Sequence, residues 1–448
     1  MPQQLRLAEL LGALSHALDL TEGQPRGHSV RCCWIGFQIG QCIGMKTEEL
    51  SDLYYTLLLK DLGCSSNAAR VCELYLTDDR RFKQDFKQID GSLPQALRFV
   101  LGHTGLNANL ADRFRSIVNI LRNGGEISRE LIEARCHRGA EIAHKMRFSE
   151  NVCNGIRNLD EHWDGSGKPE QHSGRVIPLS SQIALLSQVT DVFFQTNGRE
   201  AAIREINNRS GSWFAPDLVE VFNALSDSDE FWHALKSTEL GGLVLELEPA
   251  SEVRLVDDDY LDDVATAFAQ VIDAKSSFTR GHSERVAVFA DLIAEELGHS
   301  PEKRRWLKRA ALLHDIGKVA ISNTILDKPA KLSNEEFDVI KSHPVHSADI
   351  LSGVSVFADM AQVARSHHER LDGKGYPDGL QAHQISLDTR IITTADVFDA
   401  LTADRPYRSA MPVSQALSIM AKDINTAFDP VCFDALQRAL AKAESAAA

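Results

Sequence analysis

The sequence predicts an all-α protein built from two helical bundles in tandem, and three observations lead to this prediction. The chain has 448 residues, which exceeds the usual size of a single hydrophobic core. Its apolar residues recur mainly with helical spacing, and segments that alternate like β-strands are few. Three short motifs occur twice in the same order, which indicates two homologous domains.

The repeated motifs relate the two copies position by position. They are GHSVR at 27–31 and GHSER at 281–285, LLLKDLG at 57–63 and ALLHDIG at 311–317, and DGSGKP at 164–169 and DGKGYP at 372–377. The first two pairs are offset by 254 residues and the third by 208, so one intervening segment is longer in the first copy. Such a long period excludes a solenoid, whose repeats are much shorter.

We place the boundary between the copies in a linker. Gly241, Gly242 and Pro249 interrupt helical periodicity there, and LVLELEP alternates like a short strand. The predicted parts are a first domain at 1–235, a linker at 236–256 and a second domain at 257–448.

Helix boundaries can be read in the second copy. The segment from Arg285 to Leu297 has apolar residues on one face and ends at Gly298, a residue typical of helix C-termini. Ser300 followed by Pro301 begins the next helix, which continues to His314.

A third helix of the second copy begins with a capping box formed by Ser333 and Glu336. It ends at His343 because Pro344 follows. Histidines therefore occur at helix ends, where side chains from different helices can converge on one point.

Composition excludes several classes of protein. The net charge of −15 argues against nonspecific nucleic-acid binding, and no DNA-binding helix-turn-helix pattern is apparent. No apolar run is long enough for a membrane span, and the first residues do not resemble a signal peptide. Eight cysteines without CxxC pairs fit reduced thiols, so we expect a soluble cytoplasmic protein.

A set of imidazoles and carboxylates in the second copy predicts a metal centre. A lone histidine on a helix is usually a packed or surface group, but the adjacent His-Asp of HDIGK has no packing rationale. Such ligands suit Zn, Mn, Fe, Co or Ni, and the lack of nearby cysteine argues against a structural thiolate zinc site. The candidate ligands are His282, His314, Asp315, His343, His367, His368 and Asp396.

These residues, followed by DGKGYPDG and DVFDALTADRPYR, resemble the HD-GYP family of the HD phosphohydrolase superfamily over roughly residues 260–440. The resemblance implies two HD-like bundles, the second with a binuclear metal site. Members of this family are metal-dependent phosphodiesterases that linearise bacterial cyclic dinucleotides, chiefly cyclic di-GMP.

The resemblance also implies a role for each site residue. One metal would be bound by His282, His314, Asp315 and Asp396, and the other by Asp315, His343, His367 and His368. Lys318 would lie at the reacting phosphate, where its charge stabilises developing negative charge. The expected nucleotide contacts are Tyr376, Asp399, Arg405 and Arg408.

The sequence departs from the family pattern at one position and throughout the first copy. Some members hold a third ion with a glutamate where this chain has Phe278, so we expect two ions. In the first copy, ligand-type residues persist as His28, Asp61 and His137 at the positions of His282, Asp315 and His343. The other positions differ: they hold Lys60 for His314, Cys64 for Lys318, Leu159 and Asp160 for the histidine pair, and Gln188 for Asp396. We therefore predict a first domain that is not catalytic. A structural role, as a packing partner or a dimerisation surface, is favoured over a sensor whose state biases the second domain.

The leading functional hypothesis is hydrolysis of cyclic di-GMP by metal-activated hydroxide, giving the linear dinucleotide and in some cases GMP. One alternative keeps the site but changes the substrate to hybrid cyclic GMP-AMP or another nucleotide. A second alternative is a cyclic-dinucleotide receptor without turnover. The sequence leaves the metal identity and the oligomeric state open, with a homo-oligomer among the options.

Overall fold

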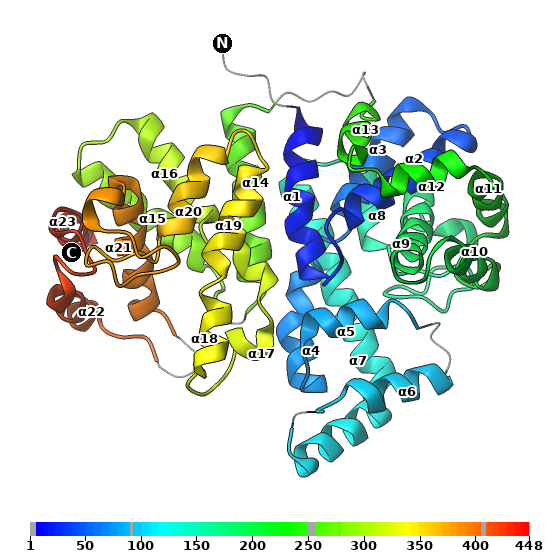
Figure 1. Cartoon of the computed structure of the whole chain (residues 1–448), viewed down its shortest axis with the longest axis horizontal. Helices are drawn as coiled ribbons and strands as arrows, with labels where there is room; N and C mark the ends of the chain where they lie inside the picture. Colours follow the sequence, from blue (N-terminus) through cyan, green and yellow to red (C-terminus); the bar gives the residue numbers. More distant parts are fainter. Residues whose placement is uncertain are drawn as a thin grey trace. The chain divides into compact units, whose positions relative to one another are not determined.

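The structure, a computed structural model, describes residues 6–89, 93–106, 108–249, 256–276, 278–404 and 409–447. Helices and short 3-10 helices account for its regular structure, and only isolated β-bridges interrupt them within these ranges (Figure 1). The all-α prediction is confirmed. The chain divides into two compact units, Met1–Asp257 and Asp258–Ala448.

The first unit is an α-helical bundle around helix α2. Its helices are α1 Leu7–Thr21, α2 His28–Cys42, α3 Thr47–Leu59, α4 Ala68–Tyr75, α5 Asp79–Phe86, α6 Leu93–His103, α7 Leu110–Lys145, α8 Glu150–Arg157, α9 Leu179–Asn197, α10 Arg199–Asn208, α11 Pro216–Ser226, α12 Asp229–Lys236 and α13 Leu240–Glu246. Helix α2 packs against α3 and α9.

The second unit repeats this plan around helix α15. Its helices are α14 Asp258–Asp273, α15 His282–Glu296, α16 Pro301–Leu313, α17 Asn323–Leu326, α18 Asn334–Ile340, α19 His343–Ser352, α20 Ala361–Ser366, α21 Leu387–Thr402, α22 Val413–Met420 and α23 Pro430–Ala447. Helix α15 packs against α16 and α21, and α19 packs against α20 and the 3-10 helix η4 Ile316–Ala320.

Several local predictions can be checked directly. Ser300 caps α16, and Ser333 with Glu336 forms the capping box of α18, as expected. The expected end of that helix at His343 is wrong: α18 ends at Ile340 and His343 begins α19, because proline is tolerated in the first turn of a helix. The strand expected in the linker is wrong, because Leu240–Glu246 forms helix α13 and buries Leu240 and Val244, which lie on one helical face. Residues 250–255 of the predicted linker lie outside the described residues. Among the helices described, none is both long and apolar enough to cross a membrane.

Candidate metal centre

The GHS motif sets the start of α15 and the position of His282. Gly281 has a φ of 68°, a left-handed conformation that glycine adopts without strain. The hydroxyl of Ser283 donates a hydrogen bond of 2.7 Å to Asp273, and this contact holds the first turn of α15 against α14. His282 is thereby buried at the N-terminus of α15, facing the interior of the unit.

The HDIG motif places two further candidates where α16 ends. His314 follows the last residue of α16, and Asp315 precedes η4; both side chains are almost completely buried. Gly317 is needed because a Cβ at this position would collide with the carbonyl of His343 on α19. This close approach brings the His-Asp pair next to the histidine that begins α19.

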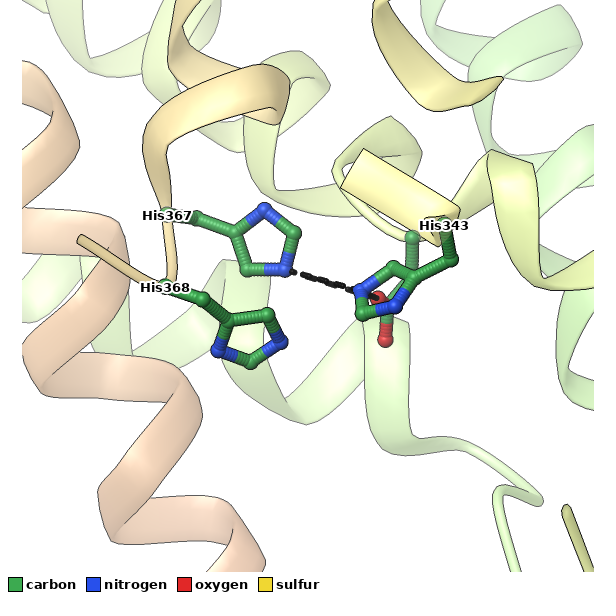
Figure 2. A group of neighbouring side chains, drawn as sticks. His343, His367 and His368 are labelled. Atoms are coloured by element: carbon green, nitrogen blue, oxygen red, sulfur yellow. Dashed lines mark hydrogen bonds and ion pairs between the residues drawn. The ribbon is translucent and has the colours of Figure 1, made fainter. Parts of the chain in front are cut away.

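The remaining histidines lie on the two helix ends opposite Asp315. His343 begins α19, and His367 and His368 follow α20, so their three rings point toward a common centre (Figure 2). The ring centroids of His367 and His368 are 4.1 Å apart, and His368 lies 5.1 Å from His343. The adjacent His-His pair therefore contributes both rings to one cluster.

Backbone carbonyls decide which ring nitrogen faces the centre. The Nδ1 atoms of His314, His343 and His367 each lie 2.6 Å from the carbonyl oxygen three residues earlier in the chain. Because a carbonyl only accepts hydrogen bonds, each Nδ1 holds a proton, and in the neutral ring each Nε2 then keeps a lone pair. That arrangement is typical of metal-binding histidines.

The two oxygens of Asp315 face different pairs of imidazoles. Its Oδ2 lies 3.5 Å from Nε2 of His282 and 3.3 Å from Nε2 of His314. Its Oδ1 lies 3.2 Å from Nε2 of His343 and 3.6 Å from Nε2 of His367. One carboxylate thus borders two neighbouring sets of nitrogen donors, an arrangement suited to two cations.

Asp396 completes the set from helix α21. Its Oδ1 lies 3.3 Å from Nε2 of His282 and 4.0 Å from Nε2 of His314. Within the described residues, Nε2 of His282, Nε2 of His314 and Oδ1 of Asp315 are buried without a hydrogen-bond partner. Buried polar atoms are rarely left unpaired, and these are the atom types that bind divalent transition metals, so the residues fit such ions.

Ionisation at the centre reflects its burial and its charges. Burial alone would raise the pKa of Asp315, but Lys318 and His314 hold it well below its usual range. Burial lowers the pKa of His343 to about 4, so this imidazole is neutral at pH 7. Burial also opposes protonation of His282, yet its contacts with Asp315 and Asp396 raise its pKa to about 10. The carboxylates therefore attract positive charge.

Asp399 orients a candidate ligand in this structure. Its Oδ2 lies 2.7 Å from Nδ1 of His282, and Arg285 donates from Nε to its Oδ1 at 2.5 Å. The side chain is only 2% exposed, and these two partners use both of its oxygens. Asp399 was predicted as a nucleotide contact. In the structure its carboxylate is held by Arg285 and orients the ring of His282.

Lys318 and Tyr376 border the centre. Lys318 pairs with Asp315 and is 18% exposed, so its ammonium lies at the edge of the cluster. The ring of Tyr376 lies 4.8 Å from that of His368, and burial raises the pKa of its hydroxyl. Phe278 is half-buried. Arg405 and Arg408 lie outside the described residues.

Glu369 is a site residue that the sequence analysis did not assign. Its carboxylate accepts hydrogen bonds from the backbone N–H groups of Asp378, Gly379 and Leu380 at 2.7 to 3.0 Å. It thereby anchors the glycine-rich loop that follows the histidine pair. Glu161 in the first copy accepts from the backbone of Glu170 in the same way. Glu161 and Glu369 are separated by 208 residues, the same offset as the motifs that follow them, and this recurrence could have identified Glu369 from the sequence.

In the first unit, Lys60 stands at the position of His314, so an ammonium group takes the place of the imidazole nitrogen that faces the candidate metal centre. Lys60 contacts Asp61, and its Nζ lies 3.1 Å from Nε2 of His28. His28 keeps its hydrogen bond to a carboxylate, because its Nδ1 lies 2.7 Å from Asp191, the counterpart of Asp399. The buried ammonium therefore supplies positive charge between the same histidine and aspartate.

One expected correspondence between the copies is wrong. His137 was matched to His343, but Arg135 takes that position. A Cβ on Gly317 would collide with the carbonyl of His343, and a Cβ on the equivalent Gly63 would collide with the carbonyl of Arg135. His137 instead lies on the surface with a side chain that is 41% exposed. Arg135 pairs with Asp160, so a second tethered cation occupies this cleft.

Comparisons with known proteins agree with this geometry. A family model described as HD domain matches residues 115–218 and 266–432. The chain is 52% identical over 434 residues to the 3′3′-cGAMP-specific phosphodiesterase 3 of Vibrio cholerae serotype O1, covering 97% of this chain and 94% of that protein. A crystal structure of a cyclic GMP-AMP specific phosphodiesterase of V. cholerae, V-cGAP3, matches with a TM-score of 0.66 at 47% identity and 97% coverage of both chains.

A second kind of relative matches over a shorter region. The cyclic di-GMP phosphodiesterase response regulator RpfG of Xanthomonas campestris pv. campestris is 44% identical over 178 residues. That alignment covers 39% of this chain and 47% of the regulator. The similarity thus extends through both units in the first relative and through less than half of the chain in this one.

Proposed function

The chain belongs to the HD-GYP family and is a cyclic-dinucleotide phosphodiesterase, and from this premise we propose that it hydrolyses 3′3′-cGAMP with two divalent metal ions. The relative that supports this substrate is named for it and aligns over 97% of the chain. The cyclic di-GMP regulator aligns over only 39%. The hybrid dinucleotide, first an alternative, is therefore preferred over cyclic di-GMP.

The arrangement of Asp315 is the observation that best supports a centre for two ions. Its two oxygens border separate pairs of imidazoles, all presenting Nε2. We assign one ion to His282, His314, Asp315 and Asp396, and the other to Asp315, His343, His367 and His368. We specify only a divalent transition metal, because a set of nitrogen and oxygen ligands of this kind binds several such ions.

The residues around the ions have separate tasks in hydrolysis. Bound divalent ions activate water and stabilise charge on phosphodiester oxygens, which is the chemistry that cleaves a P–O bond. Lys318 at the edge of the cluster contributes a positive charge to the phosphate that reacts. Asp399 keeps Nδ1 of His282 protonated, so that its Nε2 stays available as a ligand. Tyr376 offers a ring beside His368 for the nucleotide.

The test is product chromatography with the metal-loaded whole protein and three substrates: 3′3′-cGAMP, cyclic di-GMP and cyclic di-AMP. We expect the hybrid dinucleotide to be linearised with the highest kcat/KM. His314→Ala should abolish turnover, whereas His383→Ala, which changes an exposed histidine, should not. Preference for cyclic di-GMP would overturn the substrate, and ligand binding without any product would support the receptor alternative.

A further inference from the structure

The first unit contains a cavity of about 320 Å³ in the cleft that corresponds to the metal centre of the second unit. Asp160 lines it at the position of His368, and Lys168 lines it at the position of Tyr376. Because Lys60 and Arg135 have replaced two metal-binding imidazoles, this cleft has lost its catalytic ligands but has kept its space.

Positive charge is concentrated in this cavity. Its charged lining residues are Lys83, Lys87, Arg135 and Lys168 on the basic side, and Glu22 and Asp160 on the acidic side. Four cations against two anions leave an excess of two positive charges, although the whole chain has a net charge of −15. A local excess of this kind attracts small anions.

One of the four cations is available to a ligand. Lys87 lies 2.6 Å from Glu22, Lys83 lies 3.7 Å from the same carboxylate, and Arg135 pairs with Asp160. Lys168 forms no ion pair with any residue that the structure describes, and its side chain is half-buried at the cavity wall. It can therefore bind an anion without giving up an existing partner.

The rest of the wall is apolar and aromatic. Val71, Tyr75, Phe82 and Leu131 line the cavity and belong to the hydrophobic core of this region. Phe86 also lines it and is 39% exposed, so part of its ring can contact a ligand. Ligand sites commonly combine such an apolar wall with a few polar groups that orient the ligand.

We propose that this cavity binds a nucleoside monophosphate, with the phosphate at Lys168 and the base against Phe86. A phosphate that carries close to two negative charges complements the excess of two positive charges, and a planar base complements an aromatic wall. Ligand pockets range from about 300 to 1,000 Å³, so a cavity at the lower end suits one nucleotide better than a cyclic dinucleotide. The first unit is then a binding domain without chemistry.

Equilibrium dialysis of labelled GMP and AMP against the whole metal-loaded protein tests this site. Ser128→Phe fills the cavity from α7 at a half-buried position, and Lys168→Glu reverses the available charge. Arg204→Glu makes the same change of charge on an exposed residue of this unit outside the cavity and serves as the matched control. Thermal unfolding of each variant verifies folding, and indole-3-acetate serves as an aromatic carboxylate probe.

We expect the wild type and Arg204→Glu to bind one nucleotide molecule in the cavity. Ser128→Phe should not bind this nucleotide, and Lys168→Glu should bind it at least about tenfold more weakly. Equal binding by all four proteins would assign the nucleotide to the catalytic centre and overturn the proposal. Binding of indole-3-acetate without GMP or AMP would overturn the ligand class, and no binding of any probe would overturn the site.

Discussion

His343 and His367 face each other with their Nε2 atoms 3.3 Å apart, although the Nδ1 of each donates to a backbone carbonyl. A neutral imidazole has a single N–H proton, so neither Nε2 has a hydrogen to share with the other. Two lone pairs at this distance repel each other unless a cation binds both. The backbone thus holds these two rings in the geometry of a ligand pair.

Removal of metal should abolish turnover and destabilise the second unit. Without cations, the buried lone pairs and carboxylates of the centre lose their compensating charge, and ions that bind only the folded state stabilise it. We expect chelated protein to lose hydrolysis of 3′3′-cGAMP and to unfold at a lower temperature, with both restored by adding back a divalent transition metal. Elemental analysis and calorimetry measure this; full activity in a metal-free sample would contradict it.

Asp399→Asn should weaken the metal centre without unfolding the protein. The amide cannot supply the negative charge that favours the Nδ1-protonated form of His282, and loss of such a supporting carboxylate typically costs about 10–100-fold in metal affinity or activity. The readout is metal affinity by competition with a chromogenic chelator. Asp388→Asn on the same helix, which changes the partner of Lys303 instead, should leave the affinity unchanged.

Lys60→Met should destabilise the first unit while leaving the number of bound metal ions unchanged. The ammonium is completely buried against Asp61, and removal of one partner of a buried ion pair costs about 3–5 kcal/mol. Urea unfolding of the whole chain measures the loss, with the exposed Lys46→Met as the control. A variant that unfolds like the wild type would show that this cation is dispensable.

His28 should make stability depend on pH between about 4 and 6.5. Burial and the charge of Lys60 lower its pKa to about 4, from 6.5 in the unfolded chain. In this interval only the unfolded chain binds the proton, so the free energy of unfolding decreases as the pH falls, by about 3 kcal/mol in all.

The effect of His28 can be isolated by a difference measurement. Burial raises the pKa of Asp19 to about 6, which changes stability in the opposite direction over an overlapping range. Urea unfolding of wild type and His28→Gln should therefore be compared at each pH, because the contribution of Asp19 is common to both proteins and cancels in the difference between the two curves. Parallel curves would disprove the assignment.

The candidate ligands could be predicted from the sequence because their motifs are local. HDIG, the adjacent His367 and His368, and the order of the motifs are all visible without coordinates, and so are the helical periodicity and the caps at Ser300 and Ser333. Helix caps and periodicity depend on residues a few positions apart, which explains why these predictions held.

Other assignments required the tertiary structure, because they depend on which atoms meet across long separations in the chain. The contact of Asp399 with His282 could not be read from the sequence, and His137 was matched to His343 until the packing against Gly63 identified Arg135.

The sequence by itself thus determined the helical class, the duplication and the set of candidate metal-binding side chains. Only the folded chain decided that the two oxygens of Asp315 serve different imidazole pairs, and that the ammonium of Lys60 contacts both Asp61 and His28 in the other copy. The reason is physical: helix formation and donor chemistry are properties of short segments, whereas the direction of a lone pair or a charge is set by packing between distant helices.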